Sequence, residues 1–345
     1  MRALLACAVL TLTACADKEL RTPFAISNNA VAYHAPTETV YSFAGLKAGK
    51  THHDVSADAF ACDLTSQTCE VISPLPDKVG RLAATAKTVG DIIYIFGGYS
   101  VAEDGSETST PEVFAYNVKL GRYQRKSDMP MPVDDTVSLV YKDRFIYLVS
   151  GWHKDGNVVN VQLYDTQTDA WEPATDWPGA PVFGHAGGIV ENVIAVCDGV
   201  IVKQPVPPET KRSFTDISAC WRGDIDVNDP TQITWRRLKQ LPGKGHYRMA
   251  ATGWPVKNMI VFAGGSDNPY NINGIGYDDE PSAPSAHVWA YDITKDDYIL
   301  FKDKPIPTMD HRGLIHLERN KFITVGGMGK DQNVLARVST FAINR

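Results

Sequence analysis

The sequence predicts an all-β protein built from repeats, and three observations support that prediction. Short apolar runs that end in glycine recur along the whole chain, and each is followed by a second run of aromatic and apolar residues. A proline interrupts most of the units after their last run. The composition agrees, because the 345 residues include 27 Gly, 21 Pro and 10% aromatic side chains, as is typical of a β protein rich in turns.

The first element of each repeat is an apolar run of strand-forming residues that ends in a small residue and Gly. Successive final glycines lie 53, 53, 48, 66 and 62 residues apart. Such regular spacing is the mark of a repeat architecture rather than of two unrelated domains. The six runs cover residues 40–45, 92–98, 145–151, 193–199, 259–265 and 322–327.

The next elements are an aromatic–apolar run with a polar end and then a second aromatic strand. The runs with polar ends lie at 59–63, 113–117, 161–165 and 288–292. The aromatic residues that follow are Tyr123, Trp171, Trp235 and Tyr298. Prolines that cannot continue a strand then close the units, at positions 76, 130, 178, 242 and 307.

This order of a double glycine, a Tyr-Asp pair, a Trp and a Pro resembles the kelch repeat, over nearly all of the chain after residue 20. The resemblance implies that each repeat is one four-stranded blade of a β-propeller. An isolated blade exposes both faces of its sheet, and packing against its neighbours around a ring buries them. We therefore expect an all-β, six-bladed kelch-type β-propeller over residues 20–345.

The two ends of the repeat region are expected to close the ring together. The last unit ends with a third strand at 338–343, and residues 20–27 precede the first unit as a spare strand. We expect this N-terminal strand to complete the last blade. A seventh blade would need another repeat of about 50 residues, like those already counted.

The first residues form a separate element. A positive start at Met1-Arg2 is followed by a short apolar run that ends in Leu-Thr-Ala-Cys at Cys15. The run is shorter than the roughly 20 residues that span a bilayer, so it predicts a signal peptide. Small residues before Cys resemble a bacterial lipobox. This implies a lipoprotein signal at 1–14, a lipidated Cys15, a tether at 15–19 and a place on the periplasmic side of the outer membrane; an ordinary cleaved signal is the alternative.

Four cysteines remain outside the leader and allow three pairings. In the propeller implied by the kelch resemblance, Cys62 and Cys69 lie on neighbouring strands of the first blade. Cys197 and Cys220 likewise fall on the second and third strands of one blade. We therefore predict Cys62–Cys69 and Cys197–Cys220 disulfides, which suit an oxidising compartment.

The charge excludes one class of partner. The formal net charge is −6, and both signs are scattered along the chain, whereas a nucleic-acid binder needs a basic stripe. We expect no nucleic-acid partner, no cofactor, no metal site, a monomer, and contact with a membrane through the lipid anchor only.

Polar residues gather in the loops that the kelch resemblance places on one face of the ring. Six of the nine His lie in these loops or in the connections between blades. Arg, His and Asp around aromatic rings suit an acidic sugar or glycan, so carbohydrate binding is the preferred function. The expected binding residues are Arg81, Asp135, His153, His246, Arg248, Tyr270, His311 and Arg312. Asp134 and Asp135 are expected in a solvated turn, and residues 266–286 as a lid or a disordered insertion. The alternative is that loops simply hold the polar residues of the chain.

A second resemblance suggests an enzyme. Blade count, N-terminal closure and the long fifth-unit insertion are similar to the periplasmic sialic acid mutarotase (N-acetylneuraminate epimerase) family. That family carries a catalytic Arg, which Arg212 approximates, and a catalytic Glu, where this chain has Val200. Asp198 or a His would then supply the acid–base group, and we take Arg212 and His185 as candidate catalytic residues. Copper-radical galactose oxidase chemistry is not expected, because every mature Cys is placed in a disulfide. A protein-interaction scaffold is the third hypothesis.

Overall fold

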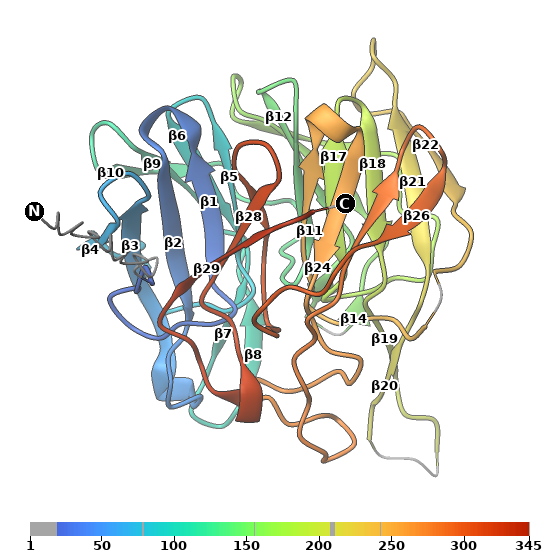
Figure 1. Ribbon diagram of the computed structural model, residues 1–345. Coiled ribbons are helices and arrows are strands. Elements are labelled where there is room, and N and C mark those ends of the chain that lie inside the picture. Colours follow the sequence, from blue (N-terminus) through green and yellow to red (C-terminus); the bar gives the residue numbers. More distant parts are fainter. Residues whose placement is uncertain (1–18, 78, 155, 208–210, 242, 345) are drawn as a thin grey trace, which may run out of the picture.

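The structure is a computed structural model, and it describes residues 19–344 apart from 78, 155, 208–210 and 242. The predicted signal peptide, the lipidated Cys15 and most of the tether lie outside the described residues. The described part forms a ring of antiparallel sheets, and Figure 1 shows them around a common axis.

The ring contains six blades, as the repeat predicts. Blade 1 consists of β1 (Ala30–His34), β2 (Thr39–Leu46), β3 (Val55–Asp63) and β4 (Thr68–Ile72). Blade 2 consists of β5 (Thr85–Val89), β6 (Ile92–Phe96), β9 (Val113–Asn117) and β10 (Arg122–Lys126). Blade 3 consists of β11 (Val137–Tyr141), β12 (Phe145–Val149), β15 (Val161–Asp165) and β16 (Ala170–Ala174). Blade 4 consists of β17 (Ala186–Val190), β18 (Val193–Cys197), β21 (Cys220–Ile225) and β22 (Ile233–Arg237). Blade 5 consists of β23 (Ala250–Trp254), β24 (Met259–Ala263), β25 (Val288–Asp292) and β26 (Asp297–Leu300). Blade 6 consists of β27 (Ile315–His316), β28 (Lys321–Val325) and β29 (Val338–Ala342). The predicted six-bladed all-β propeller is confirmed.

The remaining elements are short and lie in the connections. Three hairpins extend blades 2, 3 and 4: β7 (Tyr99–Val101) with β8 (Glu107–Ser109), β13 (Trp152–His153) with β14 (Gly156–Asn157), and β19 (Val200–Lys203) with β20 (Ser213–Asp216). Four 3-10 turns complete the described elements: η1 (Ala35–Thr37), η2 (His52–Asp54), η3 (Pro255–Lys257) and η4 (Lys330–Gln332). Within the described ranges, no helix has the length and apolar character needed to cross a membrane.

Aromatic side chains fill the space between blades. In blade 2, Tyr116 of the third strand packs on Tyr123 of the fourth, with ring centroids 4.9 Å apart. Phe43 of blade 1 then meets the edge of Tyr116 at 5.7 Å. Blade 3 repeats this pair with Tyr164 and Trp171, again at 4.9 Å. The repeated aromatic positions of the sequence therefore form the interfaces that hold neighbouring blades together.

A closed ring of backbone hydrogen bonds surrounds the axis where each inner strand begins. The equivalent residues of the six blades all have positive φ: Asn28, Ala83, Asp135, Gly184, Arg248 and Asp310. In blades 1 to 5 the backbone N–H of this residue donates to the carbonyl of the equivalent residue in the preceding blade. In blade 6 the donor is His311 N, which bonds Arg248 O, and the six N–O distances are 2.7 to 3.3 Å. Asn28 N donates to Asp310 O and so joins the first blade to the last. The left-handed backbone of the five non-glycine residues is stabilised by the ring that these hydrogen bonds form.

The N-terminal segment closes the ring, as predicted, through backbone hydrogen bonds to blade 6. Leu20 O accepts from Val338 N at 2.9 Å, and Ile26 O accepts from Gly327 N at 2.9 Å. Ile26 N also donates to Leu335 O. These bonds reach the start of β29 and the loop that joins β28 to β29, and the described residues of the segment do not form a regular fourth strand.

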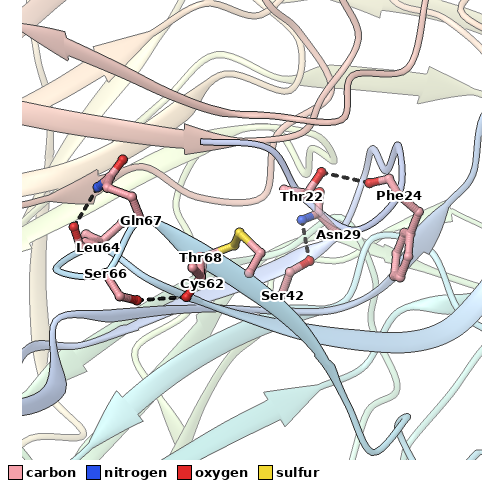
Figure 2. The surroundings of a disulfide bond; sticks show 10 residues. Thr22, Phe24, Asn29, Ser42, Cys62, Leu64, Ser66, Gln67 and Thr68 are labelled. Atoms are coloured by element: carbon pink, nitrogen blue, oxygen red, sulfur yellow. Dashed lines mark hydrogen bonds between the residues drawn. A yellow bond between two sulfur atoms is a disulfide. The ribbon is translucent and has the colours of Figure 1, made fainter. Parts of the chain in front are cut away.

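Both predicted disulfides are confirmed. Cys62 and Cys69 are directly opposed on β3 and β4, and their sulfur atoms are bonded. Figure 2 shows this bridge beside the tight turn of the hairpin, where Gln67 donates to Leu64 O and the hydroxyls of Ser66 and Thr68 are paired. The bond between Cys197 and Cys220 joins β18 to β21 and is fully buried.

Candidate functional site

The loops predicted to form the functional face do lie on one side of the ring. In each blade, the connection leading into the inner strand pairs with the start of the loop after the second strand: Ser27 with Leu46, Leu82 with Tyr99, Asp134 with Trp152, Phe183 with Val200, Tyr247 with Ser266, and Met309 with Met328. In Figure 1 the hairpins β7–β8 and β19–β20 extend from the lower side of the ring. These loops therefore share one face and surround the mouth of the axis.

A buried network of ion pairs forms the floor of this mouth. Arg248 makes a two-pronged contact with Asp135 at 2.7 and 3.1 Å and reaches Asp310 with its other terminal nitrogen at 2.9 Å. Arg312 pairs with the same Asp135. Tyr270 donates to Asp310 at 3.4 Å. Burial alone would raise the pKa of Asp135, but Arg248 and Arg312 hold it below its usual range.

A pocket of about 270 Å³ lies above this floor. Its walls are largely aromatic and come from four blades: Tyr99, Trp152, Phe183, Phe214, Tyr270 and Tyr277. Asp134, Asp135 and Arg248 line its base, and Glu107 and Arg212 are the other charged residues of the lining. A concave apolar enclosure with few convergent polar groups is the usual form of a small-molecule site.

Two carboxyl groups in the pocket are free of basic ion-pair partners among the described residues. Asp134 is 2% exposed and accepts a hydrogen bond from the Ser109 hydroxyl at 2.6 Å. Burial raises the pKa of Asp134 well above its usual value, and the Asp135 carboxylate adds to this effect. Loss of solvation by surrounding protein atoms also raises the pKa of Glu107, although Arg248 opposes the shift and the residue is still exposed at the rim. Burial therefore favours the protonated form of Asp134 relative to that of an exposed aspartate.

The expectation of a solvated turn at Asp134 and Asp135 is wrong, because both side chains are only 2% exposed. The two neighbours point to different partners, Asp134 to Ser109 and Asp135 to the arginines. Loops from adjacent blades crowd this turn and exclude water from it. Sequence reasoning could not assess that crowding.

Two arginines line the pocket, and Arg212 is the one that forms no ion pair with a carboxylate among the described residues. Its guanidinium lies over the Trp152 ring, 5.3 Å from the centroid. Arg212 also lines a second hollow of about 550 Å³ that continues outward past Lys244, Asn268 and Asp278. The position at the junction of both hollows allows it to meet an anionic group that enters from solvent.

The 266–286 loop is folded and forms one wall of the site. Asn268 donates to Asp278 at 3.0 Å, and Ser282 donates to Asn268 O at 2.9 Å. Tyr277 of this loop stacks on Phe214 of β20 with centroids 3.6 Å apart and an interplanar angle of 7°. The stacked pair joins blades 4 and 5 above the floor. The loop thus covers the mouth as a lid rather than as a disordered insertion.

The structure brings together four of the residues predicted from the sequence. Asp135, Arg212, Arg248 and Tyr270 line the aromatic pocket. Three others, His185, His311 and Arg312, line a small cavity beneath the floor. The two candidate catalytic residues, Arg212 and His185, are therefore on opposite sides of the ion-pair network.

The remaining predicted residues lie outside both cavities. Arg81 is 1% exposed and donates to Asp77 and to the carbonyl of Gly97, so it ties two blades together. The ring of His153 bonds to Pro132 O at 2.6 Å. The ring centroid of His246 lies 6.0 Å from that of His287, and burial lowers the pKa of His246.

Asp198, which the sequence offered as a substitute for the missing Glu, does not line the aromatic pocket. Its Oδ2 accepts from His246 N at 2.9 Å, and burial raises its pKa to about 7. The acids that do line the pocket are Glu107, Asp134 and Asp135, and of these Asp135 is paired with arginines. Glu107 had no signal in the sequence, because it lies in a short polar hairpin that resembles any exposed turn.

No group of three His, Cys, Asp or Glu suited to a metal ion occurs within the described ranges.

Comparisons with known proteins agree with this architecture. No protein-family model matches the chain. Kelch-like protein 15 of Mus musculus is 27% identical over 113 residues, which are 32% of this chain and 18% of that protein. An F-box/kelch-repeat protein of Arabidopsis thaliana is 32% identical over 93 residues, 26% of this chain and 23% of that one. The match thus spans about a fifth of the length of these relatives.

The solved structure of YjhT is similar over almost the whole ring. The TM-score is 0.71 with 14% sequence identity, covering 94% of this chain and 99% of that one. At this identity the likeness concerns the fold. Together these similarities describe a six-bladed propeller with kelch-like homologues.

Proposed function

We propose that this propeller binds a carbohydrate in the aromatic pocket of its loop face. The observation that carries the proposal is a pocket of about 270 Å³ with aromatic walls and a polar base. Flat apolar faces of sugar rings stack on aromatic side chains, and their hydroxyls pair with carboxyl groups such as Asp134 and Glu107. The size suits one or two sugar rings rather than a long polymer.

The charge of the pocket supports a sugar with a single acidic group. Arg248 is already paired with Asp135 and Asp310, so its charge is balanced within the floor. Arg212 is left to meet a ligand carboxylate. The proposed ligand class is therefore a monoanionic sugar whose carboxylate lies toward Arg212.

Replacing Arg212 with Ala tests this assignment. A charge-assisted hydrogen bond contributes about 1.5–3 kcal/mol, so affinity for an acidic sugar should fall roughly 10- to 100-fold. Affinity for the matching neutral sugar should change little. Isothermal titration with sialic acid, glucuronic acid and glucose would measure both effects.

The matched control is Arg122→Ala, because Arg122 is exposed on β10 and does not line the pocket. If Arg212→Ala weakens the affinity for acidic and neutral sugars equally, Arg212 does not bind the carboxylate of the ligand. If no sugar binds to the wild-type protein, the carbohydrate assignment is wrong and a protein-interaction scaffold becomes the better hypothesis.

The buried carboxyl group of Asp134, which has no basic ion-pair partner among the described residues, favours a second candidate function, a sugar mutarotase. Opening a cyclic hemiacetal requires a proton donor at the ring oxygen and a base at the anomeric hydroxyl. Asp134, with its raised pKa, can donate, and Glu107 on the same pocket wall can accept. This pair would replace the Glu that is absent at Val200.

Asp134→Asn should separate binding from turnover. The variant keeps the shape of the side chain but cannot give up a proton, so anomeric exchange should slow by about 10²–10⁴-fold while sugar binding persists. Exchange NMR on a bound reducing sugar measures the rate. Asp279→Asn, in the exposed part of the lid loop, is the control. Exchange no faster than in buffer with the wild-type protein would restrict the function to binding.

We also propose that the protein works outside the cytoplasm, anchored by lipid at Cys15. Two disulfides suit an oxidising compartment, and the leader resembles a lipobox. In a bacterial host, Cys15→Ser should move the protein from the membrane fraction to the soluble fraction and abolish incorporation of labelled palmitate. Unchanged fractionation and no label in the wild-type protein would contradict the anchor.

A further inference from the structure

A second, smaller cavity lies on the axis beneath the ion-pair floor. It has a volume of about 20 Å³ and is lined by Lys87, Thr136, Ser138, His185, His311 and Arg312, among others. A space of this size holds one water-sized particle or a small ion, and it is too small for a sugar. It is therefore a separate site from the aromatic pocket.

Arg312 has unpartnered donors in this cavity. Its side chain is only 3% exposed, and one terminal nitrogen pairs with Asp135. Its Nε and Nη2 have no hydrogen-bond partner among the described residues. Burying guanidinium donors without partners costs folding free energy, so a hydrogen-bond acceptor bound in this cavity would stabilise the folded state.

Lys87 is a second cationic group without a counter-ion among the described residues, and burial lowers its pKa to about 8. It lies on the inner strand β5, and no hydrogen bond or ion pair joins its ammonium group to any other described residue. It also lines a wider hollow of about 190 Å³ along the axis, beside Ser138 and Thr252. Lys87 therefore stands where the narrow cavity meets an opening to solvent.

The charges around the axis leave an excess of one positive charge. Arg248 and Arg312 are balanced by Asp135 and Asp310, whereas Lys87 has no acid in contact. His185 and His311 add no charge, because burial lowers their pKa values to about 4 and about 3. Lys304, bonded to Thr308 beside His311, does not add a full positive charge, because burial lowers its pKa to about 7.

We propose that the axial cavity binds one small monovalent inorganic anion, of the size of chloride, between Arg312 and Lys87. The anion would accept hydrogen bonds from the free Nε and Nη2 of Arg312 and neutralise Lys87. His185 donates through Nε2 to Val149 O, so its Nδ1 is an acceptor without a partner among the described residues and does not bind the anion. The site carries no role in sugar binding and stands independently of the proposed function.

Two measurements on the full chain test the site. Crystals soaked in sodium bromide should show a bromine anomalous peak in contact with Arg312 and Lys87. In solution, the melting temperature should rise with sodium chloride above its value in sodium gluconate at equal ionic strength. Lys87→Met, which keeps the side-chain volume, should raise the half-maximal chloride concentration about tenfold or more. Lys257→Met, on the exposed turn η3, should behave like the wild-type protein.

The proposal is overturned if the position holds a water and no bromide peak appears. It is also overturned if bromide binds only at crystal concentration, with chloride and gluconate equivalent in solution. An equal chloride response in Lys87→Met and the wild-type protein would place the effect elsewhere. Should Lys87→Met fail to fold, the bromide peak of the wild-type protein decides alone.

Discussion

Arg248→Met should destabilise the protein by about 3–5 kcal/mol, the range measured when one partner of a buried ion pair is removed. Arg248 is 3% exposed and bonds two carboxylates that are equally buried. Without it, Asp310 keeps only the weak hydrogen bond from Tyr270, and Asp135 keeps only Arg312. Denaturant-induced unfolding at pH 7 measures the loss.

Arg236→Met provides the matched control. Arg236 pairs with Asp296 on the surface, and both side chains are more than 40% exposed. Exposed pairs contribute only about 0–1 kcal/mol, so little change is expected. Adding Asp310→Asn to Arg248→Met should restore part of the stability, since it removes one unpaired buried charge. A loss below about 1 kcal/mol in the single variant would mean that the carboxylates are not ionised in the folded protein.

The second large effect should come from the buried disulfide of blade 4. Cys197 and Cys220 are 23 residues apart, and constraining a loop of that length in the unfolded chain stabilises the fold by about 3 kcal/mol. The Cys62–Cys69 bridge closes a separation of 7 residues, which gives about 2 kcal/mol. The double variant Cys197→Ala/Cys220→Ala should therefore be the less stable of the two bridge deletions.

Unfolding curves of both double variants, recorded without reductant, give the comparison. Thiol labelling of the denatured wild-type protein checks that the bridges have formed. The reverse order of stabilities would show that loop length does not govern these bridges. Identical curves for wild type and both variants would show that neither bridge stabilises the fold.

The repeat pattern was sufficient to predict the ring, because blade formation depends on local strand patterns and on repeated aromatic contacts. Tyr116 and Tyr164 occupy the same place in successive units and make the same contacts with Tyr123 and Trp171. The disulfides follow from the same register, since each pair of Cys lies on adjacent strands. Closure by separate hydrogen bonds at Leu20 and Ile26, rather than by a regular strand, was not visible in the residue pattern.

The site was predicted less completely, because its polar residues were identified by type and not by partner. Arg81 and Arg248 look equivalent in the sequence, yet Arg81 binds Asp77 between blades whereas Arg248 lies under the pocket. Histidines were favoured for their number in the loops, but His185 and His311 are neutral and lie below the floor. Burial by loops from other blades decides these outcomes, and a single repeat carries no information about it.

The ring of backbone hydrogen bonds also determines how the protein would respond to mechanical force. Pulling on the N-terminal end first loads the bond between Leu20 and Val338, and then those of Ile26 with blade 6. Next in line is the bond from Asn28 to Asp310, which belongs to a circle that passes through every blade. Tension that reaches Asn28 is therefore shared around the circumference, and the first blade cannot be peeled away until the circle breaks.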